Sequence, residues 1–157
     1  LLQAQVAAGR DVAAVVVEPI QAEGGDNHAS PAFFVALRQL CAARGVYLIV
    51  DEVQTGCGSS GKMWAHEYWE LPQGEEPDFV TFSKKFQIGG YFHKASVRPD
   101  RGYRVFNTWM GEPIKMLQLA TILDVMERDG LMEMTRRAGE TLGLGLERLQ
   151  AAYPEGL

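Results

Sequence analysis

Three short apolar runs, each followed by polar residues, limit the possible folds of this chain more than any other feature. They occupy residues 11–20 ("DVAAVVVEPI"), 46–50 ("VYLIV") and 78–82 ("DFVTF"). The first is continuous, β-branched and closed by proline, which is typical of a strand buried on both faces. A helical pattern separates the first run from the second. A strand, a helix and a strand at this spacing predict a right-handed βαβ unit in a parallel sheet, and hence an α/β fold.

The helical pattern spans residues 30–45 and carries signals at both ends. Ser30 is a typical N-cap, Pro31 suits the first helical position, and Gly45 is a common stop signal. The apolar residues between them recur at helical spacing: Phe33, Phe34, Leu37, Leu40 and Cys41. Two more helices are predicted, a strongly apolar one at 113–130 and an amphipathic one at 131–153.

Composition narrows the class of protein. The 157 residues are about one domain long, and the formal net charge of -5 argues against non-specific binding to nucleic acid or to an anionic membrane. Two cysteines form no disulfide framework, and the longest apolar stretch is too short to cross a bilayer. No signal peptide is visible. Because the chain starts at Leu1 and stops in "YPEGL", we expect it to be a piece of a longer protein.

Ligands bind at the carboxyl ends of the strands in an open parallel sheet, and each predicted strand ends in polar residues. These residues are Glu18 after the first strand, Asp51, Glu52 and Gln54 after the second, and Ser83, Lys84 and Lys85 after the third. We therefore expect the functional site at this edge of the sheet.

The glycine-rich segment "GCGSSGK" at 56–62 offers an alternative, because it fits the G-x-x-x-x-G-K pattern of phosphate-binding loops. Met63 follows, however, where a hydroxyl would be needed to hold magnesium, and the loop does not start directly at the end of the strand. Asp51 and Glu52 would also place negative charge near the phosphates. A plain glycine loop is the favoured interpretation.

A metal site is also considered and not favoured. Asp26 with His28, and His66 with Glu67, are potential ligands, but neither pair has a strong zinc spacing. His66 lies in the aromatic-rich "WAHEYWEL", so it is interpreted as a packed or hydrogen-bonded histidine.

A third interpretation combines Asp51 with a lysine about thirty residues later, at the next strand end. Pyridoxal phosphate needs a lysine for its Schiff base and a carboxylate that keeps the pyridine nitrogen protonated. The opposite charge of the pyridinium keeps such a carboxylate ionised. Because aspartate at a strand end is also common as a helix cap or turn former, this spacing alone leaves both interpretations open.

Several motifs resemble the class III (ω-amino acid) aminotransferases. They are "VVVEPIQAEGGDNHASPAFF", "LIVDEVQTGCGSSGKMWAHEYW", "TFSKKFQIGGYFH" and "YRVFNTWMGEP". The resemblance covers nearly the whole chain in the same order, and it is strongest to the mitochondrial 4-aminobutyrate branch. It implies a fragment of the large domain of a fold-type I pyridoxal-phosphate-dependent transferase, with a parallel-rich sheet flanked by helices. It also implies a homodimer with active sites at the subunit interface.

The resemblance further implies roles for particular residues. Lys84 matches the Schiff-base lysine, Asp51 the partner of the pyridine nitrogen, and Gln54 a contact of the cofactor's phenolic oxygen. Thr108 matches a threonine that reaches the cofactor phosphate of the neighbouring subunit. Glu23 matches a glutamate that gates a substrate-binding arginine.

The choice between the two adjacent lysines stays open on spacing alone. Lys84 is the expected catalytic residue, and Lys85 a neighbour that tunes it by its charge or anchors the loop. Adjacent side chains at a strand end point opposite ways, so one lysine can enter the cleft while the other does not.

The expected activity is transfer of the amino group of an ω-amino acid, most closely 4-aminobutyrate, to 2-oxoglutarate. Lysine 6-aminotransferases share similar "DEVQTGCG" and "SKK" motifs and are the alternative. A non-catalytic or nucleotide-binding domain that uses 56–62 is a more distant one. Residues 1–125 are expected to belong to the large domain, and 126–157 to a helix that leads toward a C-terminal small domain. The expected compartment is the cytoplasm, or the mitochondrial matrix in a eukaryote.

Overall fold

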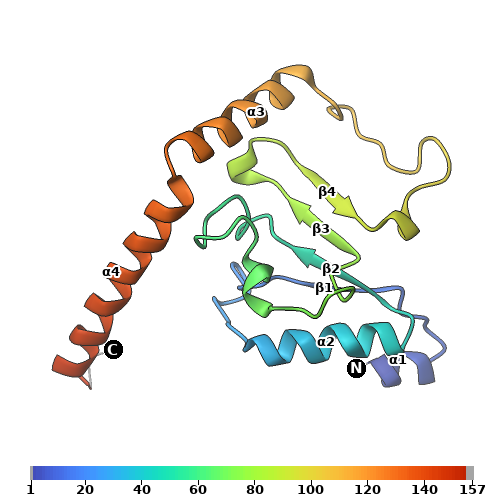
Figure 1. Ribbon diagram of the computed structural model, residues 1–157. Coiled ribbons are helices and arrows are strands. Elements are labelled where there is room, and N and C mark those ends of the chain that lie inside the picture. Colours follow the sequence, from blue (N-terminus) through green and yellow to red (C-terminus); the bar gives the residue numbers. More distant parts are fainter. Residues whose placement is uncertain (1, 155–157) are drawn as a thin grey trace.

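The computed structural model describes residues 2–154 and contains a four-stranded mixed sheet in the order β1-β2-β3-β4 (Figure 1). Residue 1 and residues 155–157 lie outside the described residues. They are the ends of the expected segments 1–125 and 126–157. The strands are β1 (Ala14–Val17), β2 (Tyr47–Asp51), β3 (Phe79–Phe82) and β4 (Gly90–His93). The first three are parallel and β4 is antiparallel to β3, so the predicted parallel-rich α/β sheet is confirmed.

The crossover helix α2 (Pro31–Ala43) connects β1 to β2 and covers one face of the sheet (Figure 1). It begins as predicted, because the Ser30 hydroxyl accepts a hydrogen bond from the Phe33 amide at 3.3 Å and Pro31 follows the cap. The Phe34 ring stacks on Trp69, with ring centroids 3.9 Å apart. The core between helix and sheet comprises Phe34, Cys41, Val46, Leu48, Val50, Trp69 and Val80.

A buried ion pair ties α2 to the start of β3. Arg38 Nη1 donates to Asp78 Oδ2 at 2.8 Å, and both side chains are about nine-tenths buried. The same carboxylate oxygen accepts a hydrogen bond from the Leu48 amide of β2 at 2.8 Å. This pair stabilises the amino end of β3, the end opposite to the predicted site.

The expectation that residues 11–20 form a strand buried on both faces is wrong. The strand is shorter, and β1 lies at the edge of the sheet, where Val16 is 63% exposed. Only one of its faces is covered by α2 in the described chain. The strand β4 was not anticipated either, since "GYFH" is short and takes its extended form by pairing with β3.

Two long helices end the chain, as predicted: α3 (Pro113–Arg128) and α4 (Leu131–Ala152). In α3, Leu119, Ile122 and Met126 pack against Cys57 and Phe86, next to the end of β3. The helix α4 extends away from the sheet, and none of its described residues is buried (Figure 1). The break between the helices is at Asp129 and Gly130, so the expected boundary at 125/126 falls in the last turn of α3.

The shorter helices are α1 (Leu2–Ala7) and the 3-10 turns η1 (Ala65–Trp69), η2 (Lys84–Phe86) and η3 (Ala95–Val97). None of the helices in residues 2–154 has both the length and the apolar character that a membrane span needs.

Candidate active site at the carboxyl ends of the strands

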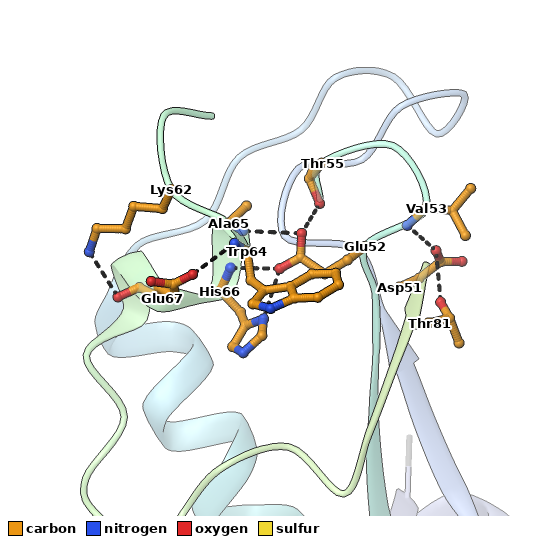
Figure 2. A network of polar contacts seen from close by, with 10 residues as sticks. All are labelled: Asp51, Glu52, Val53, Thr55, Lys62, Trp64, Ala65, His66, Glu67 and Thr81. Atoms are coloured by element: carbon orange, nitrogen blue, oxygen red, sulfur yellow. Dashed lines mark hydrogen bonds and ion pairs between the residues drawn. The ribbon is translucent and has the colours of Figure 1, made fainter. Parts of the chain in front are cut away.

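The carboxyl ends of β2 and β3 lie side by side and bring Asp51 next to Thr81. These two residues are paired in the strand register, and Asp51 Oδ1 accepts a hydrogen bond from Thr81 Oγ1 at 3.1 Å. The same oxygen accepts the Val53 amide at 3.0 Å (Figure 2). The carboxylate is half-buried, and its second oxygen, Oδ2, has no hydrogen-bond partner within residues 2–154. The carboxylate is thus held in place by one oxygen while the other can bind a cationic group.

Lys84 follows directly after the end of β3 and opens the short turn η2. Its φ is +49°, in the left-handed region that a lysine seldom adopts. The turn is closed by two backbone hydrogen bonds, from the Phe86 amide to Ser83 O at 3.2 Å and from the Gln87 amide to Lys84 O at 2.8 Å. Strained backbone of this kind concentrates at functional sites, so the conformation supports a role for Lys84 beyond that of a loop residue.

The two adjacent lysines differ in their contacts. Lys85 Nζ donates to the backbone oxygen of Gln54 at 3.4 Å, which links the turn after β3 to the loop after β2. The Lys84 side chain is exposed, and its Nζ makes no hydrogen bond or ion pair to the described part of the chain. The bond from Lys85 to Gln54 fits the interpretation of Lys85 as an anchor of the loop.

Glu23 lies on the loop after β1, at the same edge of the sheet, and is exposed. The loop is closed at its start by Glu18, whose Oε2 accepts the Ala22 amide at 3.0 Å. Thr108 is exposed in the irregular segment between η3 and α3, and its side chain makes no hydrogen bond within residues 2–154. The fold therefore gathers Asp51, Gln54 and Lys84 at one edge and places Glu23 on that edge, while Thr108 lies on a separate segment of the chain.

Glu52 does not add charge to the site edge, which corrects the sequence-based expectation. Its side chain points to the other side of the strand end from Asp51 and is fully enclosed (Figure 2). It accepts hydrogen bonds from the Thr55 hydroxyl, from the amides of Ala65 (3.1 Å) and His66 (2.8 Å), and from His66 Nδ1 (2.8 Å). Burial alone would raise the pKa of Glu52, but the hydrogen bonds from His66, Thr55 and Ala65 outweigh burial and lower it. The interpretation of His66 as a hydrogen-bonded histidine is confirmed.

The segment 56–62 does not have the geometry of a phosphate-binding loop. It leads into the five-residue 3-10 turn η1 rather than into an α-helix, whose amide groups such a loop needs. Lys62 Nζ donates to Glu67 O at 3.2 Å and lies 4.3 Å from the centroid of the Tyr68 ring. The lysine is therefore engaged within its own loop.

A cavity of about 1040 Å³ lies between the end of β3 with the turn that follows it, β4, the segment 98–112 and α3, and neither Asp51 nor Lys84 lines it. The strand-end geometry, which combines the charged groups, is the better guide to chemistry. Among residues 2–154, no group of three or more histidine, cysteine or acidic side chains is placed to hold a metal ion.

The sequence alone did not reveal the supports of the site. Thr81 contacts Asp51 only because the two strands are in register, and Thr55 contacts Glu52 only because the loop folds back. The available signal was the threonine near the end of the third apolar run, which faces Asp51 once a parallel pairing is assumed.

Comparison with known proteins shows the family to which the chain belongs. Residues 2–156 match the family described as "Aminotransferase class-III". The chain is 51% identical over 146 residues to the mitochondrial 4-aminobutyrate aminotransferase of Mus musculus, and 54% identical over 147 residues to the 4-aminobutyrate aminotransferase of Emericella nidulans. Each match covers 93% of this chain and 29% of the relative, so the chain spans less than a third of the length of these curated relatives.

Among solved structures, the lysine aminotransferase of M. tuberculosis in its internal aldimine form superposes with a TM-score of 0.84 at 37% sequence identity. That match covers 97% of this chain and 35% of the other. The chain belongs to the class III aminotransferases, and its sheet and helices have the fold-type I architecture of that family.

Proposed function

We propose that the protein is a pyridoxal-phosphate-dependent aminotransferase that moves the amino group of 4-aminobutyrate to 2-oxoglutarate, giving succinate semialdehyde and glutamate. One observation carries the proposal, the placement of Asp51 beside the strand that leads to Lys84. Asp51, at the end of β2, is half-buried and has one carboxylate oxygen without a partner in the described residues. The neighbouring strand β3 leads directly into the strained turn of Lys84. Relatives that share about half of its residues bear the name 4-aminobutyrate aminotransferase.

The residues present fit pyridoxal phosphate. The cofactor requires an amine that is not tied up by the protein and a carboxylate for its ring nitrogen. Lys84 and Asp51 Oδ2 are two such groups, since neither has a partner within the described residues. When bound, the cofactor supplies an aldehyde that reacts with amines and a ring that takes up electrons. Gln54, at the same edge, is proposed to contact the phenolic oxygen.

Each residue then has a separate task. Lys84 holds the cofactor through Nζ and, once the substrate amine replaces it, carries a proton to and from the substrate carbon as a general base. Asp51 keeps the ring nitrogen protonated by its negative charge. Glu23 is proposed to gate a substrate-binding arginine from the loop after β1.

Thr108 is exposed and its side chain makes no hydrogen bond within the described residues, so it is proposed to serve the site of a second copy of the chain. The protein is accordingly proposed to be a homodimer. The partners of the site are small amino acids and 2-oxo acids. Nucleic acid and membrane surfaces are not proposed as partners, given the net charge of -5.

Lysine 6-aminotransferase activity is the second candidate, favoured by the superposition on the enzyme of M. tuberculosis. The sequence identity to that enzyme is 37%, against 51% and 54% for the two 4-aminobutyrate relatives, which places the candidate second. Comparing glutamate formation from 4-aminobutyrate with that from lysine, at equal concentrations, separates the two.

The assignment of the lysine is tested by borohydride reduction of the whole protein with its cofactor bound, followed by peptide mapping. We expect pyridoxyl label on the peptide that contains Lys84, loss of the label in Lys84→Ala, and retention in the matched variant Lys85→Ala. Label that survives in Lys84→Ala and disappears in Lys85→Ala would reverse the assignment.

Two organisational proposals accompany the activity. Residues 1–125 are proposed to form part of the cofactor-binding domain, and α4 to lead toward a second domain, since α4 buries none of its described residues here. The mitochondrial relatives support a location in the mitochondrial matrix if the source is a eukaryote. For any other source, the proposed location is the cytoplasm.

A further inference from the structure

The carboxylate of Glu52 is fully enclosed, and the mechanism above does not use it. The side chain has no exposed surface, and it accepts four hydrogen bonds. Two come from side chains, the Thr55 hydroxyl and His66 Nδ1, and two from the backbone amides of Ala65 and His66. A charged group in such a place is costly unless its hydrogen bonds are complete, as they are here.

These bonds fasten both ends of one loop to a single residue. Thr55 lies at the start of the loop and His66 at its end, in η1. The backbone of Glu52 adds two more ties, because its amide donates to Thr81 O at 3.1 Å and its carbonyl accepts the Gly56 amide at 2.9 Å. Residues 53–64 are therefore closed into a loop whose two ends meet at Glu52 (Figure 2).

This loop carries Gln54, which lies between Glu52 and Thr55 in the chain. The backbone oxygen of Gln54 accepts bonds from Lys85 Nζ at 3.4 Å and from Ser59 Oγ at 3.3 Å. The hydrogen bond from Thr55 to Glu52 restrains the residue next to Gln54 and, with it, the backbone that carries the Gln54 side chain. Among residues 2–154, the titratable side chain that contacts Glu52 is His66, which belongs to the same network.

We propose that Glu52 is a positioning residue that acts through Thr55 to hold Gln54 in register with Asp51 and Lys84 against the bound cofactor. This inference rests on the proposed function. Glu52 touches neither substrate nor cofactor in this scheme. It sets the electronic state of the cofactor indirectly, through the one loop residue proposed to contact the phenolic oxygen.

The test uses Thr55→Val and Thr55→Ser in the whole protein with pyridoxal phosphate bound. Valine keeps the shape of threonine but removes the hydroxyl that donates to Glu52, whereas serine keeps the hydroxyl. The readouts are the pH midpoint of the visible absorption change of the bound cofactor, kcat and KM for 4-aminobutyrate, and hydrogen–deuterium exchange of the peptide that covers 53–64. We expect Thr55→Val to shift the midpoint by about one pH unit. We also expect it to lower kcat about tenfold with KM little changed, and to increase exchange in that peptide. Thr55→Ser should match the wild type.

Asp78→Asn is the matched control for stability, because it weakens a buried ion pair in the same sheet without touching the loop. It should lower the melting temperature and leave the midpoint of the cofactor titration unchanged. Glu52→Gln is a second probe of the same network. If Glu52→Gln does not fold, Thr55→Val carries the test. A wild-type midpoint and wild-type exchange in Thr55→Val, or an equal shift of the midpoint in Asp78→Asn, would overturn the proposal.

The inference and the proposed function fail in different ways. If wild-type protein shows no lysine-bound cofactor after borohydride reduction, the proposed function fails and the inference falls with it. If Lys84 carries the label and the Thr55 variants behave alike, the function stands and only the role of Glu52 is refuted.

Discussion

Asp51 and Glu52 are adjacent acidic residues with opposite fates. Successive side chains at the end of a strand project to opposite sides, so one carboxylate faces the open edge and the other the interior. Within residues 2–154, Asp51 keeps one oxygen without a hydrogen-bond partner, while both oxygens of Glu52 are bonded. The same chemical group is thus open to a proposed ligand in one position and stabilises a loop in the next.

Replacing Asp51 by Asn keeps the shape of the side chain and removes its charge. We expect turnover to fall by roughly two orders of magnitude or more while the cofactor stays bound, because the ring nitrogen loses its anionic partner. Steady-state glutamate formation and cofactor absorbance measure the two effects separately. Near-normal turnover in Asp51→Asn would mean that another carboxylate pairs with the ring.

The lowered pKa of Glu52 predicts how stability depends on pH. A group whose folded-state pKa is lowered stabilises the protein above its unfolded-state value, and this contribution is lost as pH falls through the folded-state pKa. At neutral pH, Glu52→Gln should cost roughly 1–3 kcal/mol, because donors to the carboxylate lose their acceptor. The difference in melting temperature from wild type should narrow as pH falls below 4.5, the ordinary value for glutamate. If the melting-temperature difference between Glu52→Gln and wild type stayed constant down to the acid transition, Glu52 would not be the ionised carboxylate described here.

At the scale of elements, the loop after β2 depends on a glycine with an ordinary backbone conformation. A Cβ at Gly56 would lie 2.8 Å from the backbone oxygen of Glu52 and 2.9 Å from the Trp64 ring. Because the backbone oxygen cannot move without disturbing β2, we expect Gly56→Ala to displace the loop, lower the melting temperature and weaken cofactor binding.

Gly102→Ala is the matched control, since a Cβ at Gly102 meets nothing within 4 Å. It should leave the melting temperature and cofactor affinity as in the wild type. Equal behaviour of the two alanine variants would show that the close approach at Gly56 is relieved at little cost.

At the scale of the whole molecule, the proposed site is incomplete in one copy of the chain, because Thr108 is proposed to serve the site of a second copy. Many apolar side chains are also exposed on α3, α4 and the segment before them, Ile114, Leu117 and Trp109 among them. An exposed apolar surface of this size favours association. We therefore expect the 157-residue chain on its own to form no glutamate from 4-aminobutyrate and 2-oxoglutarate and to scatter light as an assembly larger than a monomer. The mouse relative, at full length, is the positive control. Turnover by the chain alone at a comparable rate would contradict the argument.

Local patterns along the chain were enough to predict a large part of this protein. The Ser30–Pro31 start of α2 and the helical spacing of α3 and α4 depend on residues that are close in sequence, and the structure confirms them. The three apolar runs form strands, although β1 is shorter and more exposed than predicted. The edge of the sheet that carries Asp51 and Lys84 followed from parallel pairing alone.

Only the tertiary structure decided which of these residues share contacts. The pairing of Asp51 with Thr81, the enclosure of Glu52 by Thr55 and His66, and the link from Lys85 to Gln54 join residues 3–31 positions apart. The edge position of β1 and the pairing of β4 were missed for the same reason. Strand order, register and burial depend on how whole elements pack, because a side chain's partners are set by the balance of buried area and satisfied hydrogen bonds over the entire fold. No local pattern carries that balance.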